Sequence, residues 1–334
     1  MAEAKTPRAL TINISHKTIF FAIFTLLTLR FIYDIREIIV ILFISFLLAV
    51  AINPPINWLE KKRFPRALSS ILILFLTFGL LVGTIVSLVI PLFGQTQAFI
   101  NRLPSLIERL APYNFDVSTI SGELSQVPYN LLRIAVDTFS GLITSFTLNV
   151  VTFYVLQTRP KWSTYLKTWF GSKSDRIYHA LTELEVKLGH WVRGEILLML
   201  SVGTASYIGF LLIGLPFAIP LAVIAGILEI IPNLGPTIAA VPAAIVGFTV
   251  SPTHGFLTIL ISIIVQQLEN HLLVPNIMRK TTGIHPVVTI AAILIGFRLG
   301  GPLLAILSLP IVISLLVVIS HLRFNPDTEI PTIV

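Results

Sequence analysis

The sequence contains no cysteine, and only 12% of its 334 residues are charged. The absence of cysteine excludes disulfide bonds and thiolate metal sites, and it leaves the redox compartment open. The charged fraction is about half of the roughly 25% that is usual in soluble domains. Hydrophobic residues make up 55% of the chain. This composition favours a membrane protein over a water-soluble one.

Common signatures of catalysis are also lacking. The sequence has no nucleophile elbow, Walker loop or dinucleotide fingerprint, which excludes the enzymes and ATP-driven pumps that carry them. The histidines at positions 254, 271 and 285 lie far apart, without the spacing of a zinc site. We therefore expect no enzyme activity, metal or cofactor.

The net charge of +7 raises the question of a nucleic-acid partner. However, the lysines and arginines fall between apolar runs, and no aromatic residues for base stacking are interspersed among them. Basic residues in that arrangement indicate cytoplasmic loops of a membrane protein. The sequence therefore predicts the lipid bilayer as a partner and no nucleic acid.

Long apolar runs set the fold class. The run 67–94 carries no charge and exceeds the roughly 20 apolar residues that cross a hydrocarbon core. The alternation expected of barrel strands is missing, so the spans must be helices. We predict an all-α polytopic membrane protein of about seven to nine transmembrane or re-entrant helical segments.

Placing the basic loops in the cytoplasm gives a topology with both termini cytoplasmic. A single membrane domain, 1–334, then contains an N-terminal hairpin, several spans and a transport core. The predicted segments are the hairpin 18–58, spans 67–92 and 137–158, and a core 195–321 with spans 195–214 and 256–275 and broken hairpins 216–250 and 286–321.

Two segments are expected outside the lipid. Residues 92–136 predict short extracytoplasmic amphipathic helices, which suit an oligomer contact or a substrate vestibule equally well. Residues 159–193 predict a cytoplasmic amphipathic segment that lies at the headgroups, packs on its neighbours or acts as a gate.

The stretch "EIIPNLGPTIAAVPA", Glu229 to Ala243, predicts the break of the first hairpin. Pro232 removes a helical donor, Gly235 permits a left-handed turn, and Pro236 suits a first helical position. The helix should end near Ile231 and restart at Pro236, which leaves two legs too short to cross the bilayer comfortably.

A second break is predicted at Gly300, Gly301 and Pro302. In the expected topology, the first hairpin enters the membrane from outside and the second from the cytoplasm. Opposed Gly/Pro-broken segments are how inverted-repeat transporters bring helix ends to a site at the bilayer midplane.

Polar residues near these breaks are the candidate substrate or ion pathway, because polar groups in lipid are costly and usually face a cavity or a partner. Each also has a structural interpretation: a carboxyl that holds the turn, interhelical hydrogen bonds, or an interfacial anchor. The candidates are Glu229, Asn233, Gln266, Glu269, Asn270 and Arg298.

The 229–243 motif, followed by "QQLENHLLVPNIM" and "GIHPVVTIAAILIGF", resembles the AI-2E transporter family, formerly a family of uncharacterised PerM-like permeases. Order and spacing hold from about Arg193 to Pro310. The resemblance implies a multi-pass bacterial inner-membrane transporter and a homo-oligomer, namely a pentamer. It implies export of the autoinducer-2 quorum-sensing signal, as in some members, or exchange of Na⁺ or Li⁺ for H⁺, as in others.

The resemblance also assigns positions. The family's acid and turn, its polar helix and its His-Pro pair fall on Glu229, Pro232, Gly235, Pro236, Gln266, Glu269, Pro275, His285 and Pro286. The chain departs from the family pattern after Gly300, where the family usually has a further glycine near Leu303 and an alanine near Ser308. Arg298 is not a family hallmark.

Three functions remain open at this point. The first is an inner-membrane secondary transporter that exports a small polar solute, coupled to protons. The second is a Na⁺(Li⁺)/H⁺ antiporter, and the third is an oligomeric membrane scaffold that transports nothing.

Overall fold

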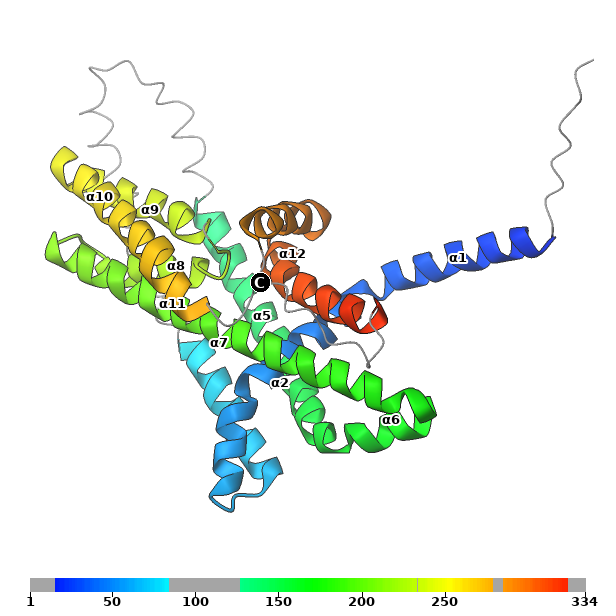
Figure 1. Ribbon diagram of the computed structural model, residues 1–334. Coiled ribbons are helices and arrows are strands. Elements are labelled where there is room, and N and C mark those ends of the chain that lie inside the picture. Colours follow the sequence, from blue (N-terminus) through cyan, green and yellow to red (C-terminus); the bar gives the residue numbers. More distant parts are fainter. Residues whose placement is uncertain (1–15, 84–126, 233, 279–284, 324–334) are drawn as a thin grey trace, which may run out of the picture. The chain divides into compact units, whose positions relative to one another are not determined.

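The computed structural model describes residues 16–83, 127–232, 234–278 and 285–323, and these residues contain helices and no strands (Figure 1). They include six helical stretches that are long and apolar enough to cross a membrane, together with two shorter apolar helices. The predicted all-α polytopic fold is therefore confirmed. The chain divides into two compact units, Met1–Ile44 and Ser45–Val334.

The first unit contains α1 (His16–Asp34) and the start of α2 (Arg36–Lys61). Backbone hydrogen bonds of helical spacing pass through Ile35, which donates to Phe31 and accepts from Ile39. The two helices are thus separated by a single residue, and no reversing turn is formed here, although the predicted hairpin 18–58 requires one between its two legs. The reason is local, because this stretch has no glycine or proline to reverse the chain.

In the second unit, the rest of α2 packs with the helix Arg66–Gly83 and with α5 (Val127–Thr158). Their shared core includes Ile56 and Leu156, both fully buried. Arg66 links the helices of this bundle at the end that the sequence predicts to be cytoplasmic. Its guanidinium donates to the Leu156 carbonyl at 3.1 Å and to Glu60 Oε2 at 2.8 Å. It thereby satisfies a carbonyl in the last turn of α5.

After α5 come a 3₁₀ turn (Arg159–Lys161), α6 (Trp162–Phe170), a second 3₁₀ turn (Gly171–Lys173) and α7 (Ser174–Leu212). Here the structure corrects the sequence prediction. The amphipathic segment 159–193 and the span 195–214 were expected to be separate, but α7 runs through both as one helix of 39 residues.

Gly194 explains the difference. It lies at the expected boundary, yet it serves close packing: a Cβ at this position would approach Sδ of Met278 to 2.9 Å. A lone glycine weakens a helix by only about 1 kcal/mol, so it does not have to end one.

The first broken hairpin consists of α8 (Ala218–Leu228) and α9 (Gly235–Val250), and we refer to it as hairpin 1. Figure 1 shows α8 beside α7, and α9 between α8 and α10 (Pro252–Leu268). α8 ends three residues earlier than expected, while α9 begins one residue before Pro236. Pro232 lies in the break, as predicted.

Close approach of the two ends requires Gly235. A Cβ here would collide with the backbone carbonyl of Leu228, and the Gly235 N–H donates to the Ile231 carbonyl at 2.9 Å. The chain thus turns back on itself over the last residues of α8.

The predicted span 256–275 is not a uniform helix. α10 is followed directly by a π-helical segment (Glu269–Leu273) and then by α11 (Val274–Met278), whose second residue is Pro275. A π segment holds one extra residue per turn and often marks a functional site.

The second broken hairpin, which we call hairpin 2, consists of the two legs of α12 (Pro286–Arg323). Gly300 (φ −154°, ψ 26°) and Gly301 (φ 66°, ψ −156°) are not helical and lie where the sequence predicts the break; Pro286 opens the first leg and Pro302 the second. His285 Nδ1 accepts the Val287 N–H at 3.3 Å at the start of the first leg. Residues 92–126 of the expected extracytoplasmic helices lie outside the described residues, and 127–136 belong to α5.

Candidate functional site

Three glutamates from different elements are buried together in the second unit. Glu195 comes from α7, Glu229 from the end of α8, and Glu269 from the start of the π segment; their exposed fractions are 3%, 0% and 1%. Each carboxyl interacts electrostatically with the other two, so the three side chains form one group. We call these three residues the carboxyl cluster.

Local structure explains each position. Glu229 caps the end of α8, with its N–H donating to the Ala225 carbonyl at 3.2 Å, just before the break of hairpin 1. Glu269 is the residue at which the helical repeat changes from α to π. Glu195 follows Gly194, and the packing of α7 against α8 and α11 carries it to the other two.

The cluster has few hydrogen bonds. Both carboxyl oxygens of Glu195 and of Glu229 are buried, and no N–H or O–H donor of a neighbouring described residue bonds to them. Glu229 and Glu269 are close enough to share a hydrogen bond when one of the two carries a proton. Glu269 accepts one bond, from Gln266 Nε2 at 3.3 Å. In the described part of the chain, none of the three makes an ion pair with lysine or arginine.

Burying ionised carboxyls in this arrangement costs free energy. An acidic residue at the centre of a membrane helix costs about 2.5–3.5 kcal/mol on insertion scales. Three ionised carboxyls side by side would add repulsion that no lysine or arginine among the described residues offsets. Binding a proton or a cation would lower this cost, and this is the chemistry that the arrangement allows.

Two polar side chains extend the cluster toward α9. Gln266 on α10 donates to Glu269, and its Oε1 accepts a hydrogen bond from Thr237 Oγ1 at 3.3 Å. Gln266 is half-buried and Thr237 is exposed, so this pair connects the buried acids with the surface of the helical core.

The predicted pathway residues are thus only partly brought together. Glu229, Gln266 and Glu269 meet, as their positions near the break and on one helix face suggested. Asn270 is exposed on the π segment, and Arg298 is exposed in the first leg of hairpin 2, with no ion pair among the described residues. Asn233 lies outside the described residues.

Sequence reasoning missed Glu195 and Thr237. A signal for Glu195 was present: it is an acid at the head of the apolar run "ILLMLSV", directly after a glycine. It was overlooked because it stood at the expected boundary between a cytoplasmic segment and a span, where a charge needs no explanation. Thr237 gives no signal in the sequence, since threonine is common in membrane helices.

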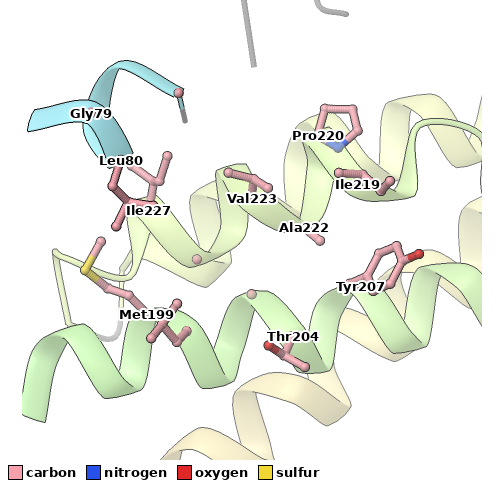
Figure 2. Close-up of a pocket in the computed structure, with 14 residues that line it drawn as sticks. Gly79, Leu80, Met199, Thr204, Tyr207, Ile219, Pro220, Ala222, Val223 and Ile227 are labelled. Carbon is pink, nitrogen blue, oxygen red and sulfur yellow. The ribbon is translucent and has the colours of Figure 1, made fainter. Parts of the chain in front are cut away.

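A separate cavity of about 870 Å³ lies between the helix Arg66–Gly83, α7 and α8. Figure 2 shows its apolar walls, with the hydroxyls of Thr204 and Tyr207 as polar groups. No member of the carboxyl cluster lines it. It is suited to apolar groups, so it does not provide the polar solute site that the sequence led us to expect.

Among the described residues, no group of three or more His, Cys, Asp or Glu side chains is arranged to hold a metal ion.

A sequence model of the protein family described as "AI-2E family transporter" matches residues 19–324 of the chain. The chain belongs to the AI-2E transporter family. It is 32% identical over 290 residues to "Putative transport protein YueF" of Bacillus subtilis (strain 168), covering 78% of this chain and 77% of the relative.

Two further AI-2E relatives are more distant. "Putative transport protein YrrI" of Bacillus subtilis is 28% identical over 321 residues, covering 86% of this chain and 87% of the relative. "Putative transport protein YhhT" of Escherichia coli (strain K12) is 24% identical over 299 residues, covering 84% and 83%. Family and relatives indicate a multi-pass membrane transport protein rather than an enzyme.

Proposed function

We propose that this AI-2E protein is a proton-coupled secondary transporter that exports a small polar solute from a bacterial cell across the inner membrane. The observation that carries the proposal is the carboxyl cluster: three buried acids, from three different elements, with no basic partner among the described residues. In this proposal the cluster is the proton-binding site.

Coupling follows from the elements that carry the acids. When the carboxyls of the cluster are protonated, burying them between α7, hairpin 1 and the π segment costs less free energy than burying the ionised forms. When it loses protons, repulsion among the carboxylates favours an arrangement in which water or a cation reaches them. The helix break after Leu228 and the π segment are the places where the regular helical hydrogen bonding is already interrupted. They are therefore the parts of the site that can move at the lowest cost.

Solute binding is assigned to the Thr237 and Gln266 pair. Their hydrogen bond is long, at 3.3 Å, and Thr237 is exposed. A solute rich in hydroxyl groups, such as an autoinducer-2-like signal, can replace this bond with shorter ones. Because Gln266 also holds Glu269, solute binding would alter the surroundings of the cluster.

A second candidate is Na⁺(Li⁺)/H⁺ antiport. It is favoured by the carboxyl oxygens of Glu195 and Glu229, which accept no hydrogen bond from a neighbouring described donor and are the ligand type that hard cations prefer. Since the acids as they stand do not form a metal-binding arrangement, this function requires them to move closer together when protons leave.

The test is transport by the purified chain in proteoliposomes. An imposed pH gradient should drive movement of a solute from a panel of small polyols and sugars, together with proton movement reported by an internal pH-sensitive dye. Glu195→Gln, Glu229→Gln and Glu269→Gln should each abolish coupling, whereas Glu37→Gln, an exposed acid in the first unit, should behave like the wild type.

Each alternative result has a meaning. Proton movement driven by Na⁺ or Li⁺, without solute movement, would establish the antiport instead. No solute or cation movement by the wild type would favour the scaffold interpretation. Unchanged coupling in the Glu229 and Glu269 variants would exclude the carboxyl cluster as the transport site.

Assembly and orientation belong to the same proposal. We expect a homo-oligomer, with a pentamer implied by the family resemblance, and native mass spectrometry of the purified protein measures this directly. We expect cytoplasmic termini and an external turn between α9 and α10. A single cysteine at the exposed Thr253 should then react with a membrane-impermeant reagent in intact cells.

A further inference from the structure

α6 exposes large aromatic side chains. Tyr165 and Trp169 lie four residues apart, which places them on one side of the helix, and Phe170 is adjacent. Their exposed fractions are 46%, 78% and 48%. An exposed tryptophan of this degree is unfavourable in water, so the face requires an apolar or interfacial surrounding.

The same side of α6 is packed where the helix begins. Trp162, which precedes Tyr165 by three residues and Trp169 by seven, stacks on Phe46 with ring centroids 6.1 Å apart, and α6 packs along α7. The aromatic side of α6 is therefore covered at its start and exposed farther along, at Tyr165 and Trp169.

The position of α6 along the chain places it near the membrane surface. The apolar part of α5 ends at Thr158, and only the 3₁₀ turn Arg159–Lys161 precedes Trp162. Three residues span at most about 11 Å, and each headgroup layer is roughly 5–8 Å thick. Arg159 fixes this turn by two hydrogen bonds to Glu185 on α7, at 2.6 and 2.9 Å.

Three exposed lysines lie in α6 or in the turns beside it, and Lys167 is on the side of the helix opposite Tyr165 and Trp169. Lys161, Lys167 and Lys173 are exposed, and none of them makes an ion pair among the described residues. Tryptophan and tyrosine are enriched at the headgroup level of membranes, and lysines near the cytoplasmic surface are attracted to anionic lipids.

We propose that α6 lies in the cytoplasmic headgroup layer, with Tyr165 and Trp169 inserted between lipids and Lys161, Lys167 and Lys173 bound to anionic phospholipid headgroups. A second copy of the chain suits this face less well, because it would have to supply acidic partners for three lysines. On the neighbouring part of α7, Glu183 and Glu185 are already paired, with Lys187 and Arg159. The proposal does not depend on what the protein transports.

The test uses the fluorescence of Trp169 in nanodiscs. The chain has four tryptophans, so the difference between wild type and Trp169→Phe isolates this residue. Lipids brominated on the acyl chains quench tryptophans that they touch. We expect several-fold stronger quenching of Trp169 by brominated phosphatidylglycerol than by brominated phosphatidylcholine at the same mole fraction.

The lysines supply the matched comparison. Replacing Lys161, Lys167 and Lys173 by glutamine should remove the preference for the anionic lipid, whereas Lys187→Gln, which alters a lysine paired with Glu183, should keep it. Equal quenching by both lipids in the wild type would overturn the proposed headgroup binding. Absence of quenching by either lipid would overturn the insertion of α6.

A second measurement covers the case in which the triple variant does not fold. Because the chain has no cysteine, Tyr165→Cys can carry the only spin label. Label accessibility to oxygen but not to a water-soluble nickel complex supports lipid insertion. Accessibility to the nickel complex indicates a helix in water, and accessibility to neither indicates a contact between copies; either result overturns the proposal.

Discussion

Hairpins 1 and 2 share a shape but differ in their surroundings. Both are helices broken by glycine followed by proline, at Gly235 in hairpin 1 and at Gly301 in hairpin 2. The break of hairpin 1 is packed against two further acidic residues and contains a buried glutamate of its own. In hairpin 2 the ionisable residue nearest the break is Arg298, which is exposed.

The difference shows that a broken helix is not by itself a site. The break shortens the legs and frees backbone groups in both hairpins, but among the described residues other elements bring buried acids only to hairpin 1. The packing of α7 and of the π segment against the break makes the difference.

The largest expected effect is the difference in stability between an alanine substitution at the break of hairpin 1 and one at the break of hairpin 2. In Gly235→Ala the new Cβ collides with the Leu228 carbonyl, and since this is backbone the two ends of hairpin 1 must move apart. We expect a loss of at least about 3 kcal/mol of stability. Gly301→Ala meets no atom within 4 Å and suffers only from its backbone conformation (φ 66°, ψ −156°), which costs about 1–3 kcal/mol for a residue other than glycine.

The midpoint of thermal unfolding in detergent measures both variants. Gly79→Ala, a helical position with open space around the new Cβ, is the control that should not lower the midpoint. Equal losses for Gly235→Ala and Gly301→Ala would show that the break of hairpin 1 is no more tightly packed than that of hairpin 2.

The next effect concerns the charge at each hairpin. Glu229→Met keeps an unbranched side chain of similar length and removes a buried carboxyl that accepts no hydrogen bond from a neighbouring described donor. We expect this variant to be more stable by about 1–3 kcal/mol and to have lost proton-coupled transport.

Arg298→Met, at the exposed position in hairpin 2, should change stability by less than about 0.5 kcal/mol. Thermal midpoints and proteoliposome flux, measured on the same preparations, test both substitutions. A destabilised Glu229→Met would mean that this carboxyl holds the turn rather than serving transport.

The smallest effect is that of a single hydroxyl group. Thr237→Val keeps the shape of the side chain but removes the hydroxyl that donates to Gln266, at a residue that also has a further interaction, so we expect a loss of about 0.5–1.5 kcal/mol. Thr289→Val is the matched change in hairpin 2, where the threonine side chain makes no hydrogen bond among the described residues, and it should be close to neutral. Thermal midpoints compare the two, and equal shifts would indicate that the Thr237 hydroxyl contributes nothing specific.

Much of this fold could be predicted from residues that act locally. Pro232, Gly235 and the Gly301-Pro302 pair stop helices for reasons that do not depend on the rest of the protein, and the structure breaks at these positions. A position of Glu229 and Glu269 inside the helical core could also be anticipated, because polar groups in apolar helices usually face a cavity or a partner.

The remaining features depend on packing between distant elements. Glu195 joins the cluster only because α7 crosses both α8 and α11, which no local pattern reveals. The π segment arises from a shift in the backbone hydrogen-bond pattern at Glu269. It could not be predicted, because the sequence around Glu269 has the pattern of an ordinary α-helix. Gly194 looked like a boundary because the contact with Met278 that explains it comes from a segment more than eighty residues away.

The uninterrupted course of α7 has a mechanical consequence. At 1.5 Å per residue its 39 residues form a rod about 58 Å long. α6 packs against α7, and Glu195 lies near the middle of α7. Between Glu195 and the C-terminal end, α7 packs against α8, where Gly203 faces Gly226. A stiff rod transmits a tilt along its whole length and turns about its most tightly packed point. A displacement at the end that carries α6 is therefore felt at the glutamates as a small rotation, and a rearrangement of the glutamates is amplified at α6.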